Sequence, residues 1–437
     1  MRVRLSVVLL LCLIPALLTA QPVPEGKPEV VVLKAARLFD GKGDAVIRNG
    51  VVIVEGGTIK AVGAGLAAPA GARVIDLGDA TLLPGLIDAH THISGESGDN
   101  WLQDAMNNMR RPLAEQAIRS TDNARRALMA GFTTLRDLGS NESVDIGLRN
   151  AIRDGVIPGP RILAANNALG ARGGHCDDSG FPYKFFPEKG PVDGIASGAD
   201  QFRDAVRFQV KYGADVIKIC ATGGVLSLAD EVDTSQLTQE ELNAIVDEAR
   251  RLRKKVAAHA HGAEGAKAAI RAGVDSIEHG SFMDDEALRM MKERGTFLVP
   301  TLLAGEYVAG RATIRHYPPE IAAKAKAAVE VRSDMFRRAL RMGVKIAFGT
   351  DSGVSPHGMN AQEFALMVDL GMSPAAALRS ATSAAADLLG LAKTLGALEP
   401  GKTADVIAVP GDPLADIKVM EKVSFVMKEG RVFKGGS

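Results

Sequence analysis

Short apolar runs rich in β-branched residues occur near both ends of the chain. They are residues 30–33, 51–54, 59–62, 404–409 and 423–427. Glycines separate them, and runs of this length bounded by turn-forming residues predict short strands. We therefore expect residues 28–83 and 397–435 to form one composite β domain, folded as a small sandwich. The middle of the chain would be inserted between its two halves.

The middle of the chain, residues 84–396, alternates helical and strand patterns instead. Thr238 and Glu241 form a capping box, which predicts the start of a helix. An apolar strand follows at 256–261, and helices and strands then alternate as far as a strand at 296–300. Strands separated by helices build parallel sheets, and about eight such units would fit. We expect an α/β fold, namely a closed (β/α)8 TIM barrel rather than an open doubly wound sheet.

The first twenty residues follow a third pattern. Arg2 and Arg4 precede an almost wholly apolar stretch, and a small residue, Ala20, ends the segment. This arrangement is typical of a cleavable signal peptide spanning residues 1–20. The alternative is a membrane anchor, but the apolar stretch is shorter than the roughly 20 residues that span a bilayer. We expect export to the periplasm or medium, cleavage near Ala20 and no stable membrane anchor.

Charge and cysteine content narrow the classes of function. The 437 residues include 52 Lys+Arg and 52 Asp+Glu, so the formal net charge is zero. No long basic run is present, and we expect no nucleic-acid partner. Cys12 would leave with the signal peptide, so Cys176 and Cys220 would remain in the mature chain. These two could pair in an oxidising compartment or stay as free buried thiols.

Residues that commonly bind metals end two of the early strands. His90 and His92 are two apart, so in a strand both imidazoles face the same side and can reach one ion. Lys218 lies in an otherwise apolar strand, where an unpaired ammonium is costly to bury. A neutral lysine amine can react with carbon dioxide to give a carbamate that bridges two cations. The alternatives are a lysine that reaches solvent at the strand end or pairs with an acid.

Later strands end in the same kinds of residue. His259 and His261 are again two apart, His279 ends the next strand, and Asp351 follows an apolar strand that begins at Lys345. Any one of these residues alone would more often have a structural role. Together they indicate an active site, because catalytic residues of a (β/α)8 barrel gather at the carboxyl ends of its strands.

The run from Pro84 to His92, followed by the lysine, histidines and aspartate above, resembles the amidohydrolase superfamily over nearly all of the mature chain. The branch that it resembles most contains Xaa-Pro dipeptidases, related carboxypeptidases and ochratoxin-hydrolysing amidohydrolases. The segments that mark this branch are 174–175, 221–225, 259–262 and 350–353. Cys176 departs from the pattern, because relatives often have glycine there. That departure bears on the shape of the pocket near His175.

The resemblance implies a metal-dependent hydrolase of carbon–nitrogen bonds with two divalent metal ions, expected to be zinc. The implied ligands are His90, His92 and Asp351 for one ion, His259 and His279 for the other, and carboxylated Lys218 as the bridge. Asp351 would also move the proton from the attacking water to the leaving amine. His261 and His175 would contact the substrate, and His261 is the alternative to His259 as a ligand.

The substrate implied by the resemblance is a dipeptide or an N-acyl amino acid, from which a C-terminal amino acid is released. Arg172, Tyr307 and His357 are candidates to bind its carboxylate. A cyclic-amide hydrolase of the imidazolonepropionase type is the alternative. From another class, a non-catalytic binding protein on the same fold is disfavoured because every ligand position is filled. A mononuclear deaminase would not need Lys218. We also expect a homo-oligomer, as is common among relatives.

Overall fold

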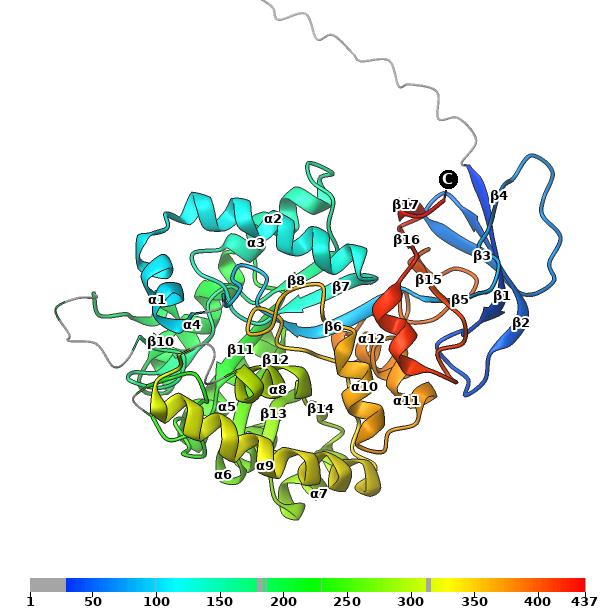
Figure 1. The fold of residues 1–437 in the computed structure, drawn as a ribbon. Helices are drawn as coiled ribbons and strands as arrows, with labels where there is room; N and C mark the ends of the chain where they lie inside the picture. The colour runs from blue at the N-terminus through cyan, green and yellow to red at the C-terminus, as the bar shows by residue number, and fades with distance from the viewer. Residues whose placement is uncertain are drawn as a thin grey trace, which may run out of the picture.

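The computed structural model describes most of the chain, namely residues 29–98, 100–178, 184, 187–228, 230–311 and 316–436. The predicted signal peptide lies outside these residues. Helices surround two parallel sheets, and a larger mixed sheet stands at one side (Figure 1). Among the helices described, none combines the length and the apolar character needed to cross a membrane.

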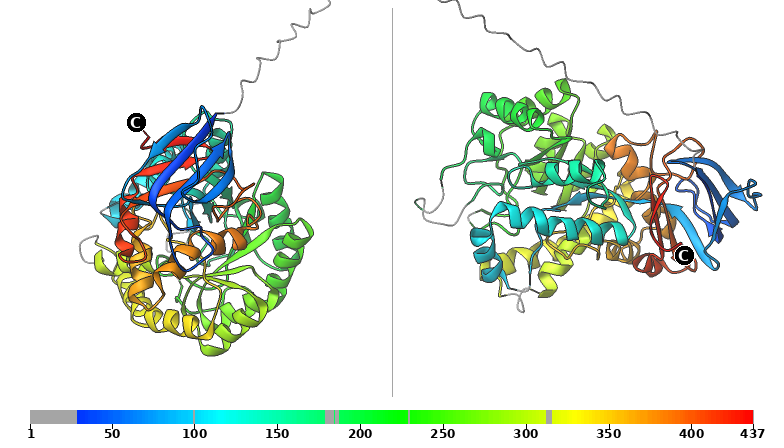
Figure 2. Two further views of the ribbon diagram at one scale, coloured as in Figure 1. Left: turned by 90° about the vertical axis from the view of Figure 1, so that its right-hand side faces the viewer. Right: turned by 90° about the horizontal axis from the view of Figure 1, so that it is seen from above.

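Strands from both ends of the chain lie in one eight-stranded sheet. The strands are β1 (Val30–Leu38), β2 (Ile47–Glu55), β3 (Thr58–Ala64), β4 (Arg73–Asp76), β5 (Ala80–Pro84), β15 (Val406–Pro410), β16 (Phe425–Lys428) and β17 (Arg431–Lys434). They are ordered β17-β16-β15-β5-β1-β2-β3, with β4 beside β1. The antiparallel pair β15–β5 joins the two ends of the chain, and Figure 2 shows the blue and red strands together. Leu33, Val52 and Phe425 belong to the apolar core of this sheet.

Two parallel sheets occupy the middle of the chain. One has the order β6-β7-β8, and the other β11-β12-β13-β14. Their strands are β6 (Leu86–Thr91), β7 (Phe132–Asp137), β8 (Arg161–Ala164), β11 (Val216–Cys220), β12 (Lys255–Gly262), β13 (Ser276–Phe282) and β14 (Phe297–Val299). A short parallel pair, β9 (Gly170–Ala171) and β10 (Ile195–Ala196), forms a separate small sheet. Because all seven strands are parallel, their carboxyl ends meet at one side of the molecule.

Backbone bonds link the edges of the two parallel sheets. On one side Leu169 bridges Ile219 of β11, just after β8. On the other side Ala89 N of β6 donates to Phe348 O at 2.9 Å, and Ile346 bridges Leu298 of β14. The links therefore run from β8 to β11 and from β14 back to β6.

The prediction of a strand that begins at Lys345 is wrong in detail. Within residues 345–350 the only bridge joins Ile346 to Leu298 of β14. Ala347 N donates to Leu298 O, whereas Phe348 N donates to Ser380 O. Because Phe348 N bonds to Ser380 O instead of to β6, Phe348 forms no bridge with β6 although its carbonyl accepts from Ala89 N.

Twelve α-helices and two short 3-10 helices fall within the described residues. The α-helices are α1 (Trp101–Arg110), α2 (Leu113–Met129), α3 (Val144–Arg153), α4 (Ala199–Lys211), α5 (Gln239–Arg251), α6 (Ala263–Ala272), α7 (Asp285–Arg294), α8 (Leu302–Arg311), α9 (Pro319–Met342), α10 (Gln362–Asp369), α11 (Pro374–Ser380) and α12 (Ser383–Leu389). The 3-10 helices are η1 (Pro191–Asp193) and η2 (Ile417–Lys422). The predicted capping box of α5 is confirmed, since Thr238 Oγ1 and the Glu241 carboxylate each accept the other residue's N–H.

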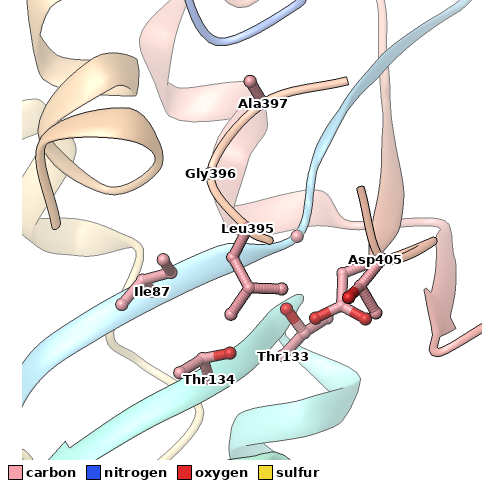
Figure 3. A pocket seen from close by; sticks show the side chains of 9 residues that line it. Ile87, Thr133, Thr134, Leu395, Gly396, Ala397 and Asp405 are labelled. Carbon is pink, nitrogen blue, oxygen red and sulfur yellow. The ribbon is translucent and has the colours of Figure 1, made fainter. Parts of the chain in front are cut away.

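A small pocket lies at the amino ends of β6 and β7, where they meet the segment before β15 (Figure 3). Ile87, Thr133, Leu395 and Asp405 line it, but it has no room for a water molecule. It lies at the opposite ends of the strands from the predicted site residues and holds no ligand-sized space.

Candidate metal centre and active site

His90, His92 and Asp351 converge at the end of β6. His90 belongs to the strand, and His92 lies one residue beyond its end. The Oδ1 atom of Asp351 is 3.4 Å from His90 Nε2 and 3.3 Å from His92 Nε2. The two-residue spacing thus places both imidazoles beside one carboxylate.

The other three histidines come from the neighbouring strands β12 and β13. The ring centroid of His279 lies 4.6 Å from that of His259 and 4.9 Å from that of His261. It also lies 5.0 Å from the ring of His90, so His279 connects the two halves of the site. Metal-ligand atoms lie within 4.8 Å of one another in two groups: His259, His261 and His279, and His90, His279 and Asp351.

Lys218 of β11 reaches His90 of this site and has only 3% of its surface exposed. Its Nζ is 3.4 Å from His90 Nε2. Burial lowers the pKa of the Lys218 amine to about 8. This pKa leaves roughly a tenth of the amine neutral at pH 7, far more than for an ordinary lysine. The neutral amine is the form that reacts with carbon dioxide.

Each of the five histidines has one ring nitrogen engaged by an outer partner. The pairs are His90 Nδ1 with Glu278 Oε2 (2.8 Å), His92 Nδ1 with Gly139 O (3.1 Å), His259 Nε2 with Gly223 O (3.1 Å), His261 Nδ1 with Ser281 Oγ (3.0 Å) and His279 Nδ1 with Thr301 Oγ1 (2.7 Å). Metal-binding histidines are usually oriented in this way, with the second nitrogen left for the ion.

The donor set fits divalent metal ions. Zinc–nitrogen bonds of 2.0–2.1 Å place tetrahedral ligands about 3.4 Å apart, close to the separations between Asp351 Oδ1 and both Nε2 atoms. Burial lowers the pKa of His90 to about 4 and of His261 to about 3, which keeps these imidazoles neutral. Burial would raise the pKa of Asp351, but His90, His92 and Lys218 together lower it to about 2.

Two of these residues have a backbone conformation that is uncommon outside glycine. His279 has φ of 69° and Asp351 has φ of 57°. Residues held in the left-handed region cost free energy and tend to occur at functional sites. The strand expected to end at His279 continues to Phe282, and His279 lies where the pairing of β13 with β12 becomes irregular; Asp351 lies just beyond the segment that bridges β14.

A buried ion pair that orients His90 was missed in the sequence. Glu278 of β13 accepts from His90 Nδ1, and its other oxygen accepts from Nη2 of Arg136 at 2.9 Å. Burial would raise the pKa of Glu278, but Arg136 and His90 lower it to about 2. The signal was available, because Glu278 and Arg136 are charged residues inside apolar strands, as Lys218 is.

His175 reaches the same site from the loop after β9. Its ring lies 4.3 Å from that of His259, tilted by 30°, and its Nδ1 is 3.0 Å from Ser227 Oγ. Burial lowers its pKa to about 4. It is placed beside the candidate metal ligands without belonging to either metal-binding group.

All eight predicted site residues line one cavity of about 1510 Å³ at the carboxyl ends of the strands. They are His90, His92, His175, Lys218, His259, His261, His279 and Asp351. The three candidates for carboxylate binding do not line it among the residues described. Arg172 is exposed and faces Glu188, the ring of Tyr307 packs against Arg311, and His357 Nε2 donates to Gly95 O.

The family model for the amidohydrolase family matches residues 81–433. The chain belongs to this family and is a hydrolase of amide bonds, which confirms the predicted superfamily and its branch. Ochratoxinase from Aspergillus niger is 34% identical over 433 residues, covering 93% of this chain and 87% of the relative.

Solved structures of similar sequence support the same family assignment. An Xaa-Pro dipeptidase with methionine bound in its active site is 42% identical, with a TM-score of 0.88 over 93% of this chain and all of that one. The structure of A. niger ochratoxinase is 33% identical, with a TM-score of 0.83 over 94% of this chain and 97% of that one. The α/β class is therefore confirmed.

Proposed function

We propose that this protein is a binuclear metal-dependent amidohydrolase that releases a C-terminal amino acid from dipeptides or N-acyl amino acids. The observation that supports this most is the single cavity lined by all eight chemistry-bearing residues. The first metal ion would be held by His90, His92 and Asp351. The second would be held by His259 and His279. Lys218, as a carbamate, would bridge the two ions. Zinc suits this mixed set of nitrogen and oxygen donors.

When bound, two divalent ions would acidify a water molecule and polarise the scissile carbonyl. Asp351 is ionised at neutral pH because its pKa is near 2. Its carboxylate can accept a proton from the attacking water and pass it to the leaving amine. This transfer requires only that the leaving nitrogen lie within hydrogen-bond reach of the same carboxylate.

His261 and His175 are suited to contact the substrate. Both are neutral near pH 7. If Ser281 donates to His261 Nδ1, the Nε2–H group of that ring is free to donate to an oxygen that gains negative charge. Ser227 donates its proton to Asp230, so it accepts from His175 Nδ1, and Nε2 of His175 is left to accept a hydrogen bond from the substrate. We assign His259 as the ligand because its partner, the carbonyl of Gly223, can only accept, so Nε2 carries the proton and the lone pair of Nδ1 is left for the ion.

The substrate class follows from the cavity and the relatives. Small-molecule pockets usually measure about 300–1,000 Å³, so about 1510 Å³ leaves room for a dipeptide or a large N-acyl group. Trp101, Met109 and Val308 are among the apolar residues that line the cavity beside the polar ones. The relatives named above act on Xaa-Pro dipeptides and on ochratoxin by their names. A cyclic amide of the imidazolonepropionase type is the second candidate.

We also propose that the two parallel sheets close into one (β/α)8 barrel over residues 84–396. The bridge between Leu169 and Ile219 and the bonds of segment 345–348 support closure. The sheet built from residues 28–83 and 397–435 would be the separate sandwich-type β domain. Export of a homo-oligomeric mature protein is proposed from the sequence alone.

The test combines metal content with hydrolysis. Mature protein made with zinc and bicarbonate would be assayed against dipeptides, N-acyl amino acids and cyclic amides. We expect about two metal ions per chain and release of a C-terminal amino acid. Lys218→Ala should lower kcat/KM at least 100-fold and reduce metal content, because it removes the bridge, whereas Lys211→Ala on the surface of α4 should change neither. One ion or none, with no amide cleaved, would contradict the proposal, and cleavage of cyclic amides alone would favour the second candidate.

A further inference from the structure

The two cysteines of the mature chain lie next to two residues of the site. Cys176 follows His175 directly, and Cys220 is two residues beyond Lys218 on β11. The structure joins the two cysteines in a disulfide that spans 44 residues of sequence, with Cα atoms 6.0 Å apart. One covalent link thus connects the loop that bears a proposed substrate contact with the strand that bears the proposed metal bridge.

The disulfide belongs to the wall of the active-site cavity. Both Cys176 and Cys220 line it. The link is tightly packed against the strand before the loop, since a Cβ added to Gly170 would lie 2.7 Å from Cys176 Cβ. The loop between this strand and the disulfide contains two consecutive glycines, Gly173 and Gly174, and residues 172–173 are exposed. A glycine-containing exposed loop is free to move unless other contacts hold it.

Polar contacts hold the opposite side of His175. Gln236 Oε1 accepts from His175 N at 2.9 Å, and Ser227 Oγ lies 3.0 Å from the ring. Ser227 in turn donates to Asp230 Oδ1 at 2.5 Å, and Gln236 donates to the other oxygen of Asp230. Lys324 of α9 donates to the backbone carbonyls of Gly224, Ser227 and Asp230, which fastens this loop to a helix.

These contacts fix the ring of His175 only if its backbone stays in place. Ser227, Asp230 and Gln236 set the direction of the imidazole, whereas the disulfide sets the position of the neighbouring Cα relative to β11. A displacement of about 1 Å at a catalytic group can cost two orders of magnitude in rate. Loss of the covalent link, by letting His175 move, should therefore lower the rate of hydrolysis.

We propose that the Cys176–Cys220 disulfide is a positioning element of the active site, which holds His175 against His259 for contact with the substrate. The inference rests on the proposed amidase function of the same cavity. The cysteines act through His175 and do not touch the reacting atoms.

The first experiment asks whether the link exists and what it holds. Peptide mapping of the exported, oxidised holoenzyme without reductant should recover Cys176 and Cys220 in one cross-linked peptide. A trialkylphosphine then reduces the disulfide to two thiols, and water supplies the oxygen of the phosphine oxide that forms. We expect hydrogen exchange of residues 170–178 to rise on reduction, while exchange of β12 and β13 stays unchanged.

The second experiment connects position to activity. Reduction should lower kcat/KM for the best amide substrate about 10- to 100-fold with metal content unchanged, and reoxidation should restore it. The double variant Cys176→Ala with Cys220→Ala should have the activity of the reduced enzyme and should not respond to the phosphine. In His175→Ala, which has already lost the contact, reduction should change kcat/KM less than twofold, because effects that act through one residue do not add.

Each outcome decides the proposal. Free thiols in the oxidised protein, or unchanged exchange of 170–178 after reduction, would overturn it. So would an equal loss of activity on reduction in His175→Ala, since the disulfide would then act elsewhere. If no amide is cleaved by any form, the proposed function fails, while the mapping and exchange data still decide whether the disulfide positions this loop.

Discussion

At the scale of single residues, charged groups buried inside strands support the ligands of the candidate metal centre. Glu278 and Arg136 are both almost fully buried and form an ion pair. Glu278 also accepts a hydrogen bond from His90. Such a pair is costly to bury but holds an imidazole in one orientation and one tautomer. The same reasoning that singles out Lys218 thus applies to residues that never touch an ion.

Glu278→Gln tests this support. We expect metal affinity to fall about 10- to 100-fold, because loss of the carboxylate removes the orientation of His90. Stability should fall by about 3–5 kcal/mol, because Arg136 stays buried without its anionic partner. Competition with a chelator and thermal unfolding would measure both effects. Glu293→Gln, on the exposed face of α7, is the matched control, and equal metal affinity in the two variants would contradict the assigned role.

A second buried acid predicts a pH dependence of stability. Glu363 accepts from the N–H groups of Leu302 and Leu303 at the start of α8, and burial raises its pKa to about 8. The folded state then holds a proton that the unfolded state releases above about pH 4.5. The contribution of Glu363 to the free energy of unfolding should therefore fall as pH rises from 5 to 8, by up to about 1.4 kcal/mol per pH unit.

Glu363→Gln should remove this dependence, because glutamine does not titrate. Denaturant unfolding of both proteins at pH 5, 6, 7 and 8 would measure the difference between their slopes. Parallel slopes would show that Glu363 is already ionised in the folded protein.

At the scale of elements, the loops after the strands place the substrate-facing groups. The loop after β11 passes so close to His175 that a Cβ added to Gly224 would lie 2.1 Å from the ring. A glycine is required there for this approach, and the loop is held to α9 by Lys324. The order of elements along the chain would not reveal that the loop after β11 packs against the earlier loop that bears His175.

Gly224→Ala should displace the ring of His175. We expect kcat/KM to fall about 10- to 100-fold, with metal content and the unfolding temperature nearly unchanged, because the loop lies outside the core. Steady-state kinetics and metal analysis would check this. Gly147→Ala in α3 is the control, since that position has open space and helical backbone, and alanine should stabilise it by up to about 1 kcal/mol. Full activity of Gly224→Ala would show that the ring has room to shift.

At the scale of the whole molecule, the candidate metal centre joins elements that are far apart in sequence. Its residues come from β6, β11, β12, β13 and the segment that ends at Asp351. Those elements belong to two different parallel sheets. Ions bound at this junction would therefore stabilise the association of the two sheets as well as supply chemistry.

Removal of metal should then lower stability as well as activity. At free metal one hundred times the dissociation constant, each ion adds about 2.7 kcal/mol to the folded state. Dialysis against a chelator should abolish hydrolysis and lower the unfolding temperature by several degrees, and zinc should restore both. Calorimetry of the two forms is the measurement, and identical unfolding temperatures would argue against metal ions at this junction.

Much of this architecture could be read from the sequence, because its cause is local. A period of two residues places His90 and His92 on one side of a strand, and a capping box begins a helix wherever it occurs. Apolar strands ending in histidine, lysine or aspartate predicted the residues that now line one cavity. The resemblance to the amidohydrolase superfamily rested on those same positions, and the family match confirms it.

Other features depend on which segments become neighbours, and only the tertiary structure decided them. The meeting of Asp351 with His90, the support of His90 by Glu278 and the pairing of Cys176 with Cys220 all join distant positions. No local pattern specifies such contacts, because they arise when helices and sheets pack as bodies. The expected strand before Asp351 was wrong for the same reason, since Phe348 N bonds to Ser380 O, which packing brings beside it, instead of to β6. Local periodicity determined the side on which each group lies, and packing determined what it meets there.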